Sequence, residues 1–303
     1  MIEASAQESS ATPPSEALTA AVAVPTEAWA SHQIVVPAQA CPTCNVPRTA
    51  AQMVPDAWVY VIGDVDARYP SLAVEKEAIG AMARAGTSGL SNEAALQKIL
   101  EVPGNAYLAR EMCFVLLVQE VETYILIPHY PQDFPMLVEA ARSELSAVIG
   151  TRGPIANPDV CNGLTLPFLI FDMIYSFDKA GLIADMPVPE GADAATFRAT
   201  ATDIFNQVAQ LIPSGTGLER ALAYLLVRDP RLYHVIADAY NRNSQLTKVD
   251  LKPAPASITQ DLVDVIVRTQ DRTTGVQSSV YARLALTGKL PYVVTYWQPY
   301  IGQ

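Results

Sequence analysis

The strongest constraint on the fold is a pair of apolar segments in the first half of the chain. CFVLLVQ (113–119) and ETYILIP (122–128) are rich in large apolar residues, and only a tight connection separates them. Two such segments joined by a short turn predict a β-hairpin. Because a hairpin pairs its strands antiparallel, the sequence favours a sheet that is mainly antiparallel.

Other segments extend this sheet and add helices. WVYVIG (58–63) predicts a strand that ends at Gly63, before a turn at DARYP (66–70). Further strands are predicted at SAVIGTRG, TLPFLIFDMIYSF, DLVDVIVRT, VQSSVYARLAL and PYVVTYW. Helical spacing of apolar residues follows Ser71, SNEAALQKIL predicts a short helix, and DFPMLVEAARSEL predicts another after its proline. This succession predicts an α+β fold with helices packed on one side of a mainly antiparallel sheet.

The chain divides into two parts by composition. Residues 1–38 are rich in Ala, Ser, Pro and Glu with little periodic pattern, which predicts a disordered leader. Residues 39–303 are expected to form a single α+β domain. Three amphipathic helices in sequence at about 193–243 predict a helical insertion in that domain.

The charge balance excludes several classes of function. The net charge is −11, whereas nucleic-acid binding requires Lys and Arg to displace counterions from phosphate. The same charge argues against an anionic membrane surface. No apolar run approaches the ~18 residues of a spanning helix, and the first basic residue is Arg48, so a secretion signal lacks its basic region. We therefore expect a cytoplasmic protein.

The chain has four cysteines: Cys41 and Cys44 in CPTC, Cys113 at the start of an apolar strand, and Cys161 before Asn162-Gly163. In a reducing compartment, thiols or metal ligands are favoured over disulfides. A thioredoxin-like role lacks the βαβ setting that it needs. A tetrahedral Zn²⁺ site would use all four sulfurs, although a second C-x-x-C pair is missing. The alternative is that Cys113 and Cys161 are buried small apolar residues.

Several stretches resemble one known family in order and spacing. They are VYVIGDVDARYPSLAVEKE, YLAREMCFVLLVQEVETYILIP, VIGTRGPIANPDVCNG and FDMIYSFD. They look like the C-terminal domain of unknown function of cyanobactin maturation proteins of the PatG and PatA type. The resemblance runs from about Cys41 to the end. It implies that Cys41, Cys44, Cys113 and Cys161 share a structural Zn²⁺. A subtilisin-like protease usually precedes this domain in the family, so protease activity does not transfer to this chain.

The resemblance supplies a pathway context, the maturation of ribosomally made peptides, and no reaction. The predicted function is a zinc-stabilised, non-catalytic accessory module that binds a precursor peptide or a partner enzyme. An exposed edge strand could receive an extended peptide. The acidic surface favours neutral or basic partners. The alternative is an enzyme that modifies the precursor peptide at an unidentified active site, and a structural module that forms a homodimer is a third reading.

The remaining motifs do not indicate a known chemistry. GTSG (86–89) predicts a loop that ends a helix, and the three histidines lack a protease context. Asp64 and Asp66 are expected to lie in a turn, and no P-loop or G-x-G-x-x-G is present. Asp172 lies among large apolar residues. If it is buried, it needs a cationic partner, for which Arg110 and Arg152 are the candidates; the cluster then forms a structural ion pair or lines a peptide-binding cleft.

Overall fold

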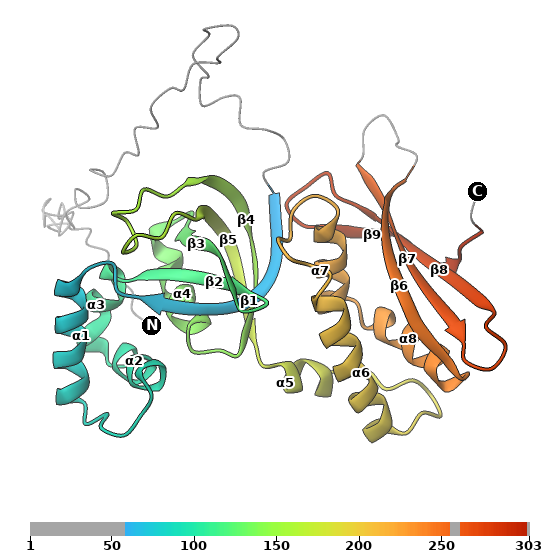
Figure 1. Cartoon of the computed structure of the whole chain (residues 1–303), viewed down its shortest axis with the longest axis horizontal. Helices are drawn as coiled ribbons and strands as arrows, with labels where there is room; N and C mark the ends of the chain where they lie inside the picture. The colour runs from blue at the N-terminus through green and yellow to red at the C-terminus, as the bar shows by residue number, and fades with distance from the viewer. Residues whose placement is uncertain (1–57, 255–260, 302–303) are drawn as a thin grey trace, which may run out of the picture. The chain divides into compact units, whose positions relative to one another are not determined.

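The computed structural model describes residues 58–254 and 261–301, which contain nine strands and eight α-helices (Figure 1). The strands are Trp58–Arg68 (β1), Cys113–Val118 (β2), Val121–Pro128 (β3), Leu145–Ile155 (β4), Pro167–Phe177 (β5), Ser244–Pro253 (β6), Leu262–Asp271 (β7), Gln277–Ala285 (β8) and Tyr292–Pro299 (β9). The helices are Leu72–Arg84 (α1), Asn92–Leu100 (α2), Ala106–Glu111 (α3), Phe134–Ala140 (α4), Lys179–Ala184 (α5), Ala194–Ala209 (α6), Glu219–Arg228 (α7) and Pro230–Asn241 (α8). The predicted leader at 1–38 and the CPTC segment lie outside the described residues.

The first five strands close into a barrel in the order β1-β2-β3-β5-β4. The predicted hairpin is present as β2 and β3, with Phe114 opposite Leu126. Its turn consists of Gln119 and Glu120, whose φ angles of 52° and 66° suit the tight turn of a two-residue hairpin. All barrel neighbours are antiparallel except β3 and β5, which are parallel. The barrel therefore has a mixed sheet.

Strand β1 is longer than the sequence predicted. The strand continues through Gly63 to Arg68, so the expected turn at 66–70 is wrong and Asp64 and Asp66 lie within a strand. A Cβ at position 63 would overlap the carbonyl of Leu117 on β2. Glycine inside a strand can mark a close approach of two backbones rather than the end of the strand. Gly63 therefore permits the close approach of β1 and β2 and does not end the strand.

The last four strands form a separate antiparallel sheet in the order β6-β7-β8-β9. Helices α6, α7 and α8 precede it within the segment where three helices were predicted, and α7 and α8 contact β7 (Figure 1). The α+β class is confirmed, but a barrel and a second sheet replace the single expected sheet. Within the described ranges, no helix has both the length and the apolarity to span a membrane.

Two hydrophobic cores share strand β1. Val59 and Val61 belong to the core that packs against α1–α4, whereas Tyr60 and Ile62 belong to the core with α5–α8 and the second sheet. Successive side chains of a strand point to opposite faces, so β1 is buried from both sides. A strand that is buried on both faces has a continuous apolar sequence, which is why apolar and polar residues do not alternate in VYVI.

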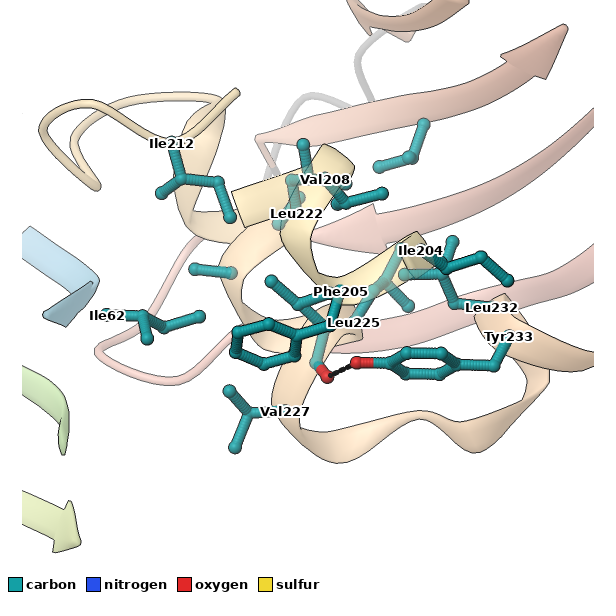
Figure 2. Close-up of a cluster of buried hydrophobic side chains, with 14 of the residues drawn as sticks. Ile62, Ile204, Phe205, Val208, Ile212, Leu222, Leu225, Val227, Leu232 and Tyr233 are labelled. Carbon is teal, nitrogen blue, oxygen red and sulfur yellow. Dashed lines mark hydrogen bonds between the residues drawn. The ribbon is translucent and has the colours of Figure 1, made fainter. Parts of the chain in front are cut away.

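A buried hydroxyl of the second core, that of Tyr233, has a hydrogen-bond partner. Tyr233 lies among Phe205, Leu225 and Leu232, and its hydroxyl donates to the carbonyl of Leu226 at 2.7 Å (Figure 2). Burial raises the pKa of Tyr233 strongly, so the phenol remains a donor at neutral pH. The bond satisfies a polar group that would otherwise oppose burial.

Gly150 permits an irregularity between β4 and β5. The register shifts there, because Ile149 faces Met173 and Gly150 faces Phe171, which leaves Asp172 as an extra residue on β5. A Cβ at position 150 would overlap the carbonyl of Ile170 and the Cα of Phe171. The bulge thus depends on glycine, and a bulge redirects the side chain that it carries.

We expect Gly150→Ala to lower the free energy of unfolding by about 1–3 kcal/mol, because the added methyl group must displace the β5 backbone. Gly104→Ala is the matched control, since a Cβ there meets nothing within 4 Å. Urea unfolding followed by circular dichroism measures both variants. Equal stability of the two variants would contradict the role given to Gly150.

Candidate functional site

The structure brings two of the four predicted metal ligands together. Cys113 and Cys161 are joined as a disulfide with their Cα atoms 5.9 Å apart. Both belong to a small apolar cluster with Val115, Ile125 and Phe168. The disulfide differs from the expectation of free thiols or metal ligands. A pair held this close suits either a disulfide or two ligands of one ion, so the spacing does not separate those states.

Cys41 and Cys44 lie outside the described residues, so the four-cysteine zinc site stays a prediction. Among residues 58–254 and 261–301, no group of three or more His, Cys, Asp or Glu side chains is placed to hold a metal ion. Cys161 is fully buried and Cys113 nearly so, which also fits the alternative that both are packed as small apolar residues.

Strand β9 forms one edge of the second sheet. In the part of the chain that the structure describes, β8 is the one strand that pairs with it. Val294 is 46% exposed and Tyr296 is 55% exposed, so this edge strand presents large apolar and aromatic side chains to solvent. The guanidinium of Arg231 lies 3.7 Å from the centre of the Tyr296 ring and holds that ring in place.

The two edges of this sheet differ in chemistry. Strand β6 carries Lys248, Asp250 and Lys252 and ends in Pro253, which are features that protect an edge from pairing with another chain. Strand β9 has the sequence YVVTYWQP, without a charged residue and with proline only at its last position. Edges of this composition readily accept a further strand. The sequence predicted the β9 strand, but not that it would be an edge.

A cluster of charged groups gathers at the bulge on β5. One carboxylate oxygen of Asp172, Oδ1, lies 2.7 Å from Nδ1 of His129 and 2.7 Å from Nζ of Lys289. The sequence proposed Arg110 and Arg152 as partners of Asp172; the structure gives it His129 and Lys289 instead. His129 follows β3, and its N–H donates to the carbonyl of Phe171, which places the imidazole beside the bulge.

The electrostatics of Asp172 favour the ionised carboxylate. Partial burial acts to raise its pKa, but hydrogen bonds from Lys289 and His129 and the attraction of their charges outweigh burial and lower the pKa below its ordinary value. Its other oxygen, Oδ2, is buried and has no hydrogen-bond partner among the described residues. The carboxylate is therefore ionised at neutral pH and held through one oxygen.

A buried arginine fixes the loop that carries Lys289. Arg220 on α7 is 5% exposed and donates to the carbonyls of Leu286, Gly288 and Lys289. Each contact orients a backbone group just before β9 begins. The loop therefore has little freedom where Lys289 reaches across to Asp172.

The family model described as the PatG Domain matches residues 58–288, which is most of the chain. The chain belongs to the PatG domain family. A solved structure described as "PatG Domain of Unknown Function" shares the fold of this PatG domain, with a TM-score of 0.63 at 16% sequence identity. The similarity covers 81% of this chain and 99% of that chain. No curated protein matches the sequence.

The sequence does not predict two residues of the cluster on β5 in this PatG domain. His129 lies in PHYP, which shows no local sign of a carboxylate partner. Lys289 is separated from Asp172 by 117 residues, so no motif joins them. Asp172 lies inside an apolar strand, which indicates that its carboxylate needs a partner but does not identify the partner.

Proposed function

We propose that this PatG domain is a zinc-stabilised module that binds an extended peptide segment by adding it to strand β9. The segment would belong to a precursor peptide or a partner enzyme in cyanobactin-type peptide maturation. The observation that carries the proposal is the uncharged edge of β9, which contrasts with the charged edge of β6. The family match supports the pathway context.

Strand addition uses the backbone of β9 for affinity and the neighbouring side chains for specificity. The exposed groups of Val294 and Tyr296 would contact alternate side chains of the added segment. Since Arg231 already orders the Tyr296 ring, binding would cost less side-chain entropy there. A segment with aromatic or β-branched residues fits this edge best.

The net charge of the chain restricts which peptides are expected to bind. The net charge of −11 disfavours an acidic peptide at any distance within a Debye length of the surface. A neutral or basic extended segment is therefore the expected occupant. The added strand requires no covalent change in either partner.

We expect Val294→Lys to weaken binding of a precursor peptide at least about tenfold, because a charge on the edge opposes strand addition. Gln245→Lys is the matched control, since it adds the same charge to β6, on the opposite edge. Isothermal titration of a synthetic precursor-type peptide, extended and neutral or basic, measures both variants. The mass of the peptide should stay unchanged.

Three outcomes would count against this proposal. Equal affinity of the two variants would remove the binding site from β9, and a changed peptide mass would favour the enzyme alternative. If Val294→Lys alters only the oligomeric state, seen by light scattering, then β9 pairs with β9 of a second copy and the homodimer reading replaces peptide binding.

The zinc part of the proposal rests on how the chain brings distant cysteines together. Cys113 and Cys161 are 48 residues apart in sequence yet adjacent in space. Cys41 and Cys44 would complete a tetrahedral sulfur site that ties the N-terminal segment to β2. In that state Cys113 and Cys161 are thiolates, and the disulfide is the alternative state of the same pair.

We expect purified protein kept under reducing conditions to contain about one zinc per chain, with loss of the fold on chelation. Cys113→Ser should lower the zinc content and the thermal midpoint together. Elemental analysis and circular dichroism measure the two effects. A fully folded reduced protein without metal would overturn the zinc site and leave the peptide-binding proposal standing.

A further inference from the structure

We propose that His129, Asp172 and Lys289 form a proton-transfer centre that hydrolyses ester-type acyl groups. This activity goes beyond the proposed binding role and does not depend on it. Three elements distant in sequence supply the centre: the end of β3, the bulge of β5 and the loop before β9. The centre lies at the surface, since the side chains of His129 and Lys289 are 46% and 45% exposed.

His129 has the arrangement of a general base. Its Nδ1 lies 2.7 Å from Asp172, so in the neutral imidazole Nδ1 carries the proton and Nε2 is left as the acceptor. The carboxylate orients the ring and stabilises the imidazolium that forms when Nε2 takes a proton. Stacking on the Tyr130 ring, with centroids 4.5 Å apart, restrains the imidazole further.

Lys289 supplies positive charge beside the base. Its ammonium and the imidazole contact the same oxygen of Asp172, so the two nitrogens are separated by at most twice the 2.7 Å contact distance. Only one N–H of the ammonium is needed for Asp172, and the others can donate to an oxygen on which negative charge develops. The ammonium also lies 5.3 Å from the centre of the Trp58 ring.

The protein holds the centre in place from two sides. The bulge that aims Asp172 depends on Gly150, where a side chain would overlap β5. The loop of Lys289 is held by buried Arg220 through three backbone carbonyls. Surface ion pairs commonly lack such support, whereas catalytic groups need their positions fixed by surrounding contacts.

The reaction we propose is attack of water on an acyl ester. Nε2 of His129 takes one proton from water while the water oxygen bonds to the acyl carbon, and the carbonyl oxygen becomes an oxyanion that Lys289 stabilises. The oxyanion then restores the C=O bond as the C–O bond to the leaving group breaks. The proton on Nε2 passes to the leaving oxygen or to solvent, so the products are a carboxylic acid and an alcohol. No oxidant or other reactant is needed.

The test is hydrolysis of p-nitrophenyl acetate by the full chain at neutral pH. We expect a loss of roughly a hundredfold in kcat/KM for His129→Gln, which is the lower range for a general base. Asp172→Asn and Lys289→Met should each lower kcat/KM, and Asp172→Glu, which keeps the carboxylate, should recover part of the rate lost in Asp172→Asn. His234→Gln is the matched control and should leave the rate unchanged.

Circular dichroism of each variant separates loss of the base from loss of the fold. A wild-type rate no greater than that of folded His129→Gln would overturn the proposal, and so would an equal loss in His234→Gln. A full wild-type rate in folded Asp172→Asn or in folded Lys289→Met would remove the role assigned to that charge, and so would equal rates in Asp172→Glu and Asp172→Asn. Peptide binding to β9 is measured separately, so neither result depends on the other.

Discussion

Burial of strand β1 on both faces is the constraint on which the rest of the fold depends. Tyr60 and Ile62 pack with the helices and the second sheet, while Val59 and Val61 pack with α1–α4. A loop before α7 reinforces this arrangement, since the N–H of Tyr60 donates to the carbonyl of Gly215 at 2.9 Å. Glu219 holds that loop by accepting from the N–H groups of Ser214 and Gly215. The barrel and the helical layer therefore share one strand.

This shared strand explains why distant residues meet at Asp172. The barrel positions Asp172 through the bulge, and the helical layer positions Lys289 through Arg220. The contact between them joins parts of the chain that only tertiary packing brings together. The same packing leaves β9 as the last strand of its sheet: Val293 and Trp297 pack against the core, whereas Val294 and Tyr296 are exposed.

Local patterns predicted the elements better than their arrangement. The hairpin of β2 and β3 and the three helices near 193–243 were visible because apolar periodicity is a local property. Strand β6 was missed because its sequence, SQLTKVDLKP, alternates poorly and carries charges that suit an edge. Helix α4 ends at Ala140, short of the predicted segment, because Leu145 already begins β4. Closure of the barrel depends on backbone approaches at Gly63 and Gly150 that no periodicity encodes.

For the cysteines too, the sequence predicts part of the site. It predicts that Cys113 and Cys161 lie together, and the structure places them in contact. Whether the pair is a disulfide or two thiolates depends on redox conditions and on Cys41 and Cys44. The positions of the cysteines in the sequence do not determine that state. In the same way, the lone carboxylate in β5 indicated partners, and the fold supplied a histidine and a lysine from two distant segments of the chain.

The central claim is that β9 receives an extended peptide, and amide hydrogen exchange tests it most directly. The exchange of residues 292–298 should be followed in the full chain with and without a saturating precursor peptide. We predict that amides of β9 slow at least about tenfold while those of β6 are unchanged, because new main-chain hydrogen bonds form only at the β9 edge. Saturation of the protein with unchanged exchange in β9, or protection confined to β6, would contradict the account.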